Sequence, residues 1–205
     1  MKRLKVLVGC EESQTVCKAF RKKGHDAFSC DIQACSGGHL EWHYEMDIDK
    51  VLCWDWDMAI FHPPCQYLTI TANRSFYNNP ERWQKRVDAL NFVWKLMNSK
   101  IEKICIENPK GVIVSHIKHP DFGKPHYIQP YHYGHKDSKM TGLWLKNLPK
   151  LKPENIVEPE WITYASGKRM SKTHGRSSST NNPSVAKMRA VTYQGIANAM
   201  ANQWG

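Results

Sequence analysis

The sequence has 205 residues, of which 41% are hydrophobic and 23% are charged, as is usual for a single soluble globular domain. No stretch approaches the roughly 20 apolar residues of a membrane span, and the apolar run at residues 6–8 is too short for a signal peptide, so we expect a cytoplasmic protein with no membrane partner. The formal net charge of +10 and the isoelectric point near 9.3 favour an anionic partner such as nucleic acid.

The first half of the sequence predicts strands that alternate with helices. Short apolar runs predict strands at residues 5–8, 27–30, 46–48, 57–61 and 103–106. Helical spacing predicts helices at 15–23 and 80–98, the second with an apolar face of Trp83, Val87, Leu90, Val93, Trp94 and Met97. Strands that alternate with helices indicate an α/β protein with a mostly parallel central sheet flanked by helices.

The second half of the sequence is less regular. Residues 116–133 are rich in His, Pro and Tyr and predict loops and short strands, and 143–145 is a further strand candidate. Residues 149–159 form a proline-punctuated linker, and 166–183 form a basic loop that we expect to be mobile because it has no apolar period. Helical spacing returns at 185–204.

The seven cysteines are an odd number, which favours free thiols over a disulfide framework in a protein without an export signal. Cys30, Cys35, His39 and His43 could supply four metal ligands. Their spacing lacks the close CxxC pair of most structural zinc sites, so we expect no metal site.

Polar residues follow several of the predicted strands. They are Glu11, Asp31, Asp47, Cys65 and Glu107. In a parallel sheet, ligands bind outside the carboxyl ends of the strands. The distribution of these side chains is therefore typical of a functional site.

Cys65 follows Pro63 and Pro64 at the end of a predicted strand. Proline restricts its own backbone and that of the preceding residue, which suits a thiol presented at a fixed angle. The alternative is a small filler side chain beyond a strand end. Glu107 is expected at the same sheet edge, and an acid beside a thiol has a clear use on a pyrimidine. The thiolate attacks carbon 6 while the acid hydrogen-bonds ring nitrogen 3, which makes carbon 5 nucleophilic.

Two segments around these residues resemble the motifs of the cytosine-5 DNA methyltransferases. They are residues 57–66, DMAIFHPPCQ, and residues 106–111, IENPKG. The resemblance implies a Rossmann-like fold that uses S-adenosylmethionine to methylate carbon 5 of a cytosine flipped out of double-stranded DNA. It also implies that Cys65 is the nucleophile and Glu107 the partner of nitrogen 3, with Pro64 and Asn108 as their neighbours in the catalytic motifs. The chain looks closest to short, single-domain versions encoded by phages, in a bacterial or phage-infected cell.

The same resemblance implies a site for the cofactor. The turn after the first strand, which carries a single glycine, would cradle its methionine end. Asp31 would meet the ribose hydroxyls, and Asp47 the adenine. The implied cofactor-binding residues are Gly9, Cys10, Glu11, Ser13, Asp31, Ile32, Asp47, Ile48, Pro63 and Asn198.

The resemblance also implies a DNA-binding surface and a division of the chain. Residues 66–79 would form a mobile loop that closes over the flipped base, and lysines stand where the family has arginines after Gly134. The implied DNA-binding residues are Gln66, Thr69, Arg74, Lys136, Lys139, Lys168, Arg169, Lys172 and Arg176. Residues 1–112 and 185–205 would form the catalytic core, and 113–184 a reduced target-recognition region that contains the basic loop 166–183.

Two other functions fit the same residues. The first is a different one-carbon modification of cytosine or of a cytosine nucleotide by the same Cys65 and Glu107 chemistry. The second is a non-catalytic module with a methyltransferase-like fold that binds DNA or a protein. Binding of S-adenosylmethionine separates the first from methyl transfer, and covalent trapping on 5-fluorocytosine separates the second from an enzyme.

Overall fold

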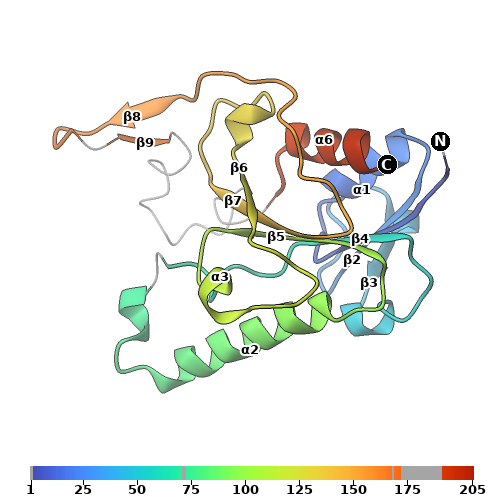
Figure 1. The fold of residues 1–205 in the computed structure, drawn as a ribbon, viewed down its shortest axis with the longest axis horizontal. Helices are drawn as coiled ribbons and strands as arrows, with labels where there is room; N and C mark the ends of the chain where they lie inside the picture. Colours follow the sequence, from blue (N-terminus) through green and yellow to red (C-terminus); the bar gives the residue numbers. More distant parts are fainter. Residues whose placement is uncertain (1, 71–72, 168, 172–190) are drawn as a thin grey trace.

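A seven-stranded sheet forms the centre of the protein (Figure 1), and its strand order is β3-β2-β1-β4-β5-β7-β6. The computed structural model describes residues 2–70, 73–167, 169–171 and 191–205. The strands of the sheet are β1 (Lys5–Gly9), β2 (Asp26–Asp31), β3 (His43–Glu45), β4 (Met58–Phe61), β5 (Lys103–Pro109), β6 (His126–Ile128) and β7 (Thr141–Lys146).

Strands β1 to β5 pair in parallel, whereas β7 is antiparallel to both β5 and β6. The expected α/β fold with a mostly parallel sheet is therefore confirmed. The chain runs outward from β1 to β3 on one side and from β4 to β5 on the other, so the strand order reverses between β1 and β4. Such a switch point opens a crevice at the carboxyl ends of the strands.

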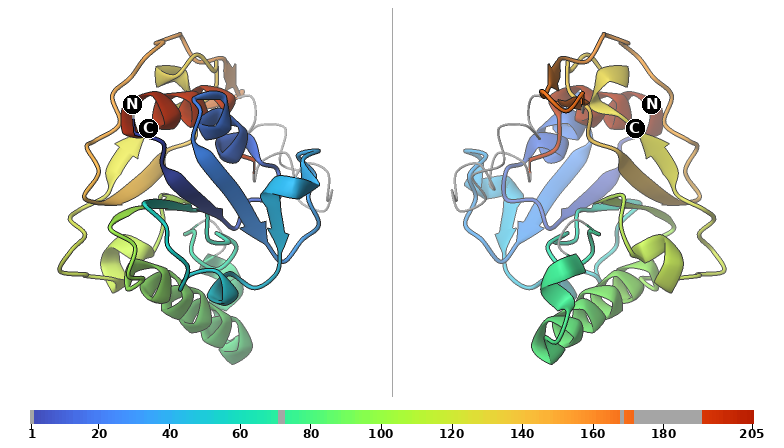
Figure 2. Two further views of the ribbon diagram at one scale, coloured as in Figure 1. Left: turned by 90° about the vertical axis from the view of Figure 1, so that its right-hand side faces the viewer. Right: turned by 90° about the vertical axis from the view of Figure 1, so that its left-hand side faces the viewer.

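Helices cover both faces of the sheet (Figure 2). Helices α1 (Thr15–Lys22) and α6 (Gln194–Trp204) pack on one face, and α2 (Pro80–Met97) and α3 (Ile113–His116) lie on the other. Each face has its own apolar core, because alternate residues of a strand point to opposite sides. In β1, Val6 and Val8 join the core under α1 and α6, while Leu7 joins the core above α2. Burial on both faces explains the near-continuous apolar runs of the strands.

The structure differs from the sequence-based expectations in its shorter elements. The third strand is β3 (His43–Glu45), and residues 46–48 do not form the expected strand, because Ile48 begins a 3-10 turn at Ile48–Lys50. Residues 191–193 are not helical, and Tyr193 has extended backbone, so α6 begins at Gln194; residues 185–190 lie outside the described residues. Residues 169–171 of the expected basic loop form β9 (Arg169–Ser171), which pairs with β8 (Trp161–Thr163).

The region predicted to recognise the target contributes to the central sheet, because β6 and β7 both lie within residues 113–184. The hairpin of β8 and β9 extends away from this sheet at the upper left of Figure 1. The recognition role of the region stays a prediction. None of the helices among the described residues is both long and apolar enough to cross a membrane.

Candidate active site

A cavity of about 700 Å³ opens at the carboxyl ends of β1, β2, β4 and β5, beside α2. We refer to it as the strand-end cavity. Most of the predicted catalytic and cofactor residues line it, although they come from five separate segments of the chain. They are Cys10, Asp31, Ile32, Asp47, Ile48, Pro63, Pro64, Cys65, Glu107 and Asn108, together with Lys139 from the predicted DNA-binding set.

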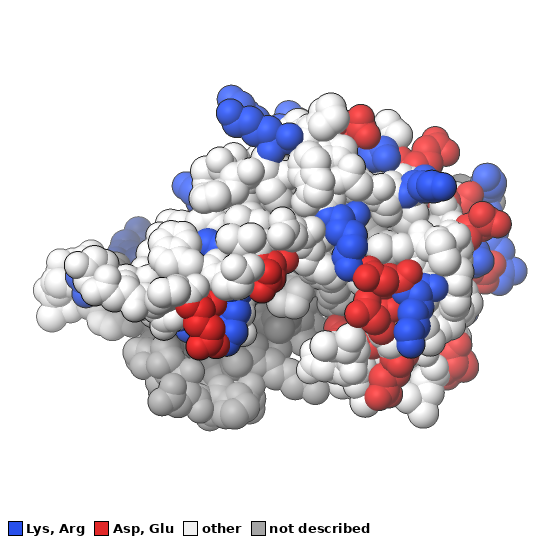
Figure 3. Space-filling model, turned by 90° about the horizontal axis from the view of Figure 1, so that it is seen from below, with Lys and Arg blue, Asp and Glu red and all other residues white. Residues whose placement is uncertain are grey.

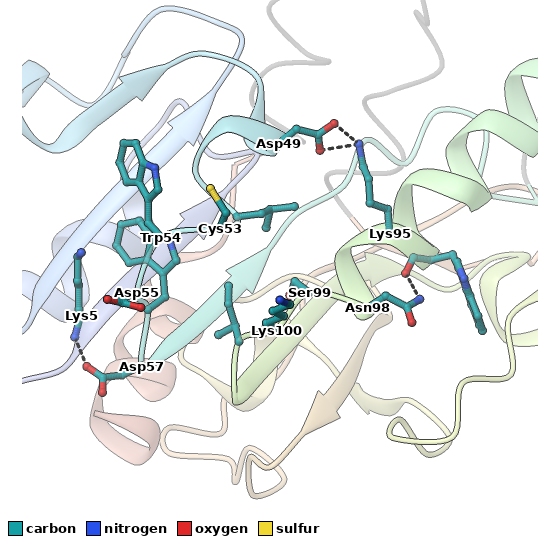
Figure 4. Close-up of a pocket in the computed structure, with 14 residues that line it drawn as sticks. Lys5, Asp49, Cys53, Trp54, Asp55, Asp57, Lys95, Asn98, Ser99 and Lys100 are labelled. Carbon is teal, nitrogen blue, oxygen red and sulfur yellow. Dashed lines mark hydrogen bonds and ion pairs between the residues drawn. The ribbon is translucent and has the colours of Figure 1, made fainter.

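A second cavity, of about 820 Å³, lies at the other end of the strands, where β1, β4 and β5 begin (Figure 4). Three of its charged side chains are engaged with protein groups. Lys95 forms an ion pair with Asp49 at 2.6 Å, and Asp57 accepts a hydrogen bond from the backbone N–H of Lys5 at 2.8 Å. The cavity contains none of the predicted catalytic, cofactor-binding or DNA-binding residues, so the candidate chemistry lies in the strand-end cavity.

Cys65 lies in a turn that directly follows β4 and the two prolines, and its side chain is exposed. The backbone N–H groups of Leu68 and Thr69 both donate to the carbonyl oxygen of Cys65, at 3.0 and 3.2 Å. The chain then passes so close to the segment after β5 that a Cβ on Gly111 would lie 2.0 Å from the carbonyl oxygen of Leu68. Only glycine fits there, and the contact fixes the turn that presents the thiol.

Arg86 of α2 holds the segment that follows this turn. Its guanidinium is buried and donates to the carbonyl oxygens of Tyr67 at 2.8 Å and Thr69 at 3.2 Å, and to the side chain of Asn73 at 2.9 Å. A buried charge requires such partners, because leaving it unpaired would be costly. Helix α2 therefore anchors the start of the segment 66–79, which is predicted to close over a substrate.

Glu107 pairs with His62, a residue to which the sequence analysis gave no role. Strands β4 and β5 are parallel with Phe61 opposite Ile106, and continuing this register by one residue places His62 level with Glu107. His62 Nδ1 lies 3.0 Å from Glu107 Oε2, and both side chains are largely buried. No hydrogen-bond partner among the described residues reaches His62 Nε2, which is also buried.

The two side chains have opposite electrostatic effects on each other. Burial opposes charge on His62, but the hydrogen bond and charge of Glu107, with the charge of Glu11, raise the pKa of His62 above its usual value. Burial favours the neutral acid at Glu107, yet the hydrogen bond and charge of His62, with the charge of Lys139, lower the pKa of Glu107. The favoured state is an imidazolium that donates to a carboxylate.

The rest of the cavity wall combines carboxylates with apolar surface. Asp31 ends β2 and accepts a hydrogen bond from the backbone N–H of Gln33 at 2.9 Å, while Asp47 accepts from Asp49 N–H at 2.9 Å and caps the 3-10 turn. Ile32 is 77% exposed at the rim, and Ile48 is buried in the wall. A flat ring could lie on this apolar part, with the carboxylates available to hydroxyl or amino groups.

Cys10 follows β1 with a φ of +59°, an uncommon backbone conformation for a residue other than glycine. Its N–H donates to the carbonyl oxygen of Cys30 at 2.7 Å, which holds the turn in place. Burial, followed by the nearby charge of Asp31, raises the pKa of the Cys10 thiol well above its usual range. Cys10 is therefore a neutral thiol in the wall.

Four residues of the predicted cofactor set do not line the strand-end cavity: Gly9, Glu11, Ser13 and Asn198. The Glu11 carboxylate accepts from the N–H groups of Val16 at 2.6 Å and Cys17 at 3.1 Å, so it caps α1 instead. Ser13 Oγ lies 3.3 Å from Thr15 Oγ1, and the exposed Asn198 accepts from Gln194 on α6. Gly9 lies at the end of β1, where a Cβ would collide with the ring of Phe61. The structure thus places these four residues outside the strand-end cavity, and a role for them toward the cofactor stays a prediction.

The predicted DNA-binding residues are spread over several segments. Gln66, Arg74 and Lys136 are exposed, Thr69 forms an isolated β-bridge with Gly111, and Lys139 lines the cavity. Arg169 lies on β9 with its guanidinium 5.0 Å from the centre of the Trp161 ring. Lys168, Lys172 and Arg176, with most of the predicted basic loop, lie outside the described residues.

Sequence reasoning missed one side of the cavity, which α2 supplies. Lys85, Asp88, Ala89 and Phe92 line it at spacings of three and four residues, as one face of a helix must. These residues do recur at the spacing of a helix face. Because they mix charged and apolar side chains, however, the hydrophobic periodicity of the sequence does not mark them as a face. His62 could have been found as a titratable residue at a strand end.

Basic side chains do not collect into one patch on the face seen from below in Figure 3, where lysines and arginines of the described residues alternate with acidic groups. Nor do the described residues contain a group of three or more His, Cys, Asp or Glu side chains placed to hold a metal ion. His43, for example, is engaged with Ser29 Oγ at 2.8 Å.

No protein-family model matches the sequence, and no curated protein matches it. Among solved structures, one assigned as a DNA modification methyltransferase encoded within an E. coli prophage is 15% identical, with a TM-score of 0.48 over 76% of this chain and 52% of its own. The S. pombe Dnmt2 methyltransferase is 16% identical, with a TM-score of 0.45 over 85% of this chain and 59% of its own. The bifunctional kinase-methyltransferase WbdD is 12% identical, with a TM-score of 0.41 over 80% of this chain and 39% of its own. This chain thus spans between 39% and 59% of the length of these three structures.

Proposed function

We propose that the protein transfers a methyl group from S-adenosylmethionine to carbon 5 of cytosine in DNA. The observation that carries the proposal is the convergence of Cys65 and Glu107 on one cavity from the ends of two neighbouring strands. The Cys65 thiolate would add to carbon 6 of the pyrimidine, and Glu107 would support protonation at nitrogen 3. Carbon 5 then becomes nucleophilic enough to take a methyl group.

The strand-end cavity suits the cofactor that this reaction needs. Its volume of about 700 Å³ is typical of a site for a small organic molecule. Asp31 would accept hydrogen bonds from ribose hydroxyls, and Ile32, Ile48 and Phe92 offer apolar surface to a purine ring. When bound, S-adenosylmethionine supplies a methyl group on a positively charged sulfur. Asp47 in the wall would complement a polar edge of the same ligand.

Double-stranded DNA is the proposed substrate, with the target cytosine flipped out of the helix, because a stacked base cannot reach a thiol in a cavity. Lys139 would meet the flipped base, since it lines the cavity close to Glu107. Gln66 and Arg74 would contact phosphates, since both are exposed on the segment after Cys65. The net charge of +10 supports an anionic partner and predicts binding that weakens as salt concentration rises.

The test is product analysis. Purified protein is incubated with DNA and S-adenosylmethionine, and the digested nucleosides are examined by mass spectrometry. We expect 5-methyldeoxycytidine from the wild type and none from Glu107→Gln. Cys53→Ser, which changes an exposed thiol outside the strand-end cavity, should leave the yield unchanged. A wild-type protein that binds the cofactor yet forms no methylated base on single- or double-stranded DNA would overturn the proposal.

A further inference from the structure

His62 is a titratable side chain in the strand-end cavity to which the proposed reaction assigns no role. Its Nδ1 lies 3.0 Å from Glu107 Oε2, the group that would face ring nitrogen 3 of the target base. A carboxylate can only accept hydrogen bonds, so Nδ1 carries the proton in this contact. The structure thus places a proton donor within hydrogen-bond distance of the proposed partner of nitrogen 3.

A carboxylate needs such a donor. Nitrogen 3 must receive a proton when the thiolate adds, but an ordinary glutamate has a pKa of about 4.3 and is ionised at neutral pH. The pKa of Glu107 is lower still because of His62 and Lys139, against the effect of burial. Glu107 alone therefore has no proton to give under these conditions.

We propose that His62 is a positioning residue that stores the proton which Glu107 delivers to nitrogen 3, an inference that rests on the proposed function. As the bond between Cys65 Sγ and carbon 6 forms, the electron pair of the carbon 5–carbon 6 double bond shifts toward carbon 4. The electron pair of the carbon 4–nitrogen 3 double bond shifts onto nitrogen 3, which takes a proton from Glu107. Because Glu107 begins as a carboxylate, the proton that it passes to nitrogen 3 is the one it has first received from Nδ1 of His62. One thiolate and one imidazolium are consumed, and Glu107 ends as the carboxylate with which it began.

The charges around His62 are consistent with this role. Glu107 faces it from β5, Glu11 acts on it from the turn after β1, and Lys139 acts on it from the segment before β7. The two acids favour the imidazolium, and Lys139 opposes it. His62 Nε2 is buried without a hydrogen-bond partner among the described residues, so only the Nδ1 side of the ring is committed to a protein group.

Histidine NMR tests the pair without any enzymatic activity. The ring signals of labelled protein are titrated in the wild type and in Glu107→Gln, with the His62 signal assigned from His62→Asn. In the wild type, His62 should titrate above the usual histidine pKa of about 6.5. In Glu107→Gln its pKa should fall. An unchanged pKa of His62 in Glu107→Gln would overturn the proposal.

The addition step itself is measured by tritium release from DNA containing 5-tritiated cytosine, without a methyl donor. Asparagine keeps an N–H near the Nδ1 position but cannot release a proton, so His62→Asn should slow release by about 100-fold at neutral pH. Its pH optimum should move toward acid, because Glu107 must then be protonated from solvent. His62→Gln serves as a second variant if the first fails to fold. His39→Gln alters an exposed histidine–glutamate contact outside the cavity and should keep the wild-type profile.

The outcomes separate the two proposals. A uniform loss of rate at every pH in both His62 variants would mean a merely structural role and would overturn the inference alone. Absence of tritium release from the wild-type protein would overturn the proposed function, and the inference with it. In that case the titration would still report whether His62 and Glu107 are coupled.

Discussion

The side-chain amide of Asn108 donates a hydrogen bond to the carbonyl oxygen of Pro63, 2.7 Å away, in the buried floor of the strand-end cavity. Asn108 directly follows Glu107, and Pro63 lies two residues before Cys65. This hydrogen bond therefore connects the segment that carries the proposed acid with the segment that carries the proposed nucleophile, although Asn108 and Pro63 are 45 residues apart in the sequence.

Replacing the Asn108 donor should weaken the link between the segment that carries Glu107 and the segment that carries Cys65. Asn108→Asp is nearly isosteric but presents an oxygen to the Pro63 carbonyl, and losing a buried hydrogen bond costs about 1–3 kcal/mol. We expect a lower melting temperature and slower formation of the Cys65 adduct. Asn147→Asp is the matched control, because Asn147 makes the same kind of bond to the Glu102 carbonyl at an exposed site. Equal effects of the two variants would contradict the role given to Asn108.

Asp31 should contribute to cofactor affinity. Asp31→Asn preserves the shape of the side chain and an oxygen that can accept from Gln33, but removes the charge proposed to meet the ribose hydroxyls. Hydrogen bonds to charged groups contribute about 1.5–3 kcal/mol, so the Kd for S-adenosylmethionine should rise roughly 10- to 100-fold. Calorimetry measures this directly.

Asp26→Asn provides the control at the other end of the same strand, where the carboxylate pairs with Arg3 on the surface. Its Kd should equal that of the wild type. A Kd that Asp31→Asn leaves unchanged would remove Asp31 from the cofactor site.

Gly111 should be intolerant of a side chain. A Cβ at this position would lie 2.0 Å from the carbonyl oxygen of Leu68, so Gly111→Ala must displace the turn that carries Cys65. Overpacking of this kind costs about 1–3 kcal/mol, which for a chain of this length lowers the melting temperature by roughly 3–10 °C.

Gly123→Ala is the comparison, because no heavy atom lies within 4 Å of the Cβ built there. It should melt close to the wild type. Similar melting temperatures for both alanine variants would mean that the close approach at Gly111 does not hold the turn.

The sheet could be predicted where the sequence carries continuous apolar runs. Most residues of β1, β4 and β5 are buried, which produces such runs, and parallel pairing then brings the carboxyl ends of these strands together. The placement of Cys65 and Glu107 in one cavity follows from this geometry. Strand β3 was misplaced because it has only three residues, and its Tyr44 stacks on Phe28 of β2 instead of extending an apolar run.

Side-chain direction could not be predicted from spacing alone. Of the expected apolar face of α2, Val93 and Met97 are buried, but Trp83 and Trp94 are 49% and 43% exposed. The buried position on that side belongs to Arg86, a charged residue that hydrogen bonds to a distant segment make acceptable. The direction of Glu11 was likewise not predictable, because its carboxylate turns back to cap α1 and does not line the strand-end cavity.

The central claim is that Cys65 attacks carbon 6 of cytosine, and covalent trapping tests it most directly. Wild-type protein is incubated with S-adenosylmethionine and DNA containing 5-fluorocytosine, in which fluorine replaces the hydrogen that must leave carbon 5. The account predicts a denaturation-resistant adduct that peptide mass spectrometry locates at Cys65, and no adduct from Cys65→Ser. An adduct that persists in Cys65→Ser, or no adduct from the wild type under conditions in which it binds both ligands, would contradict it.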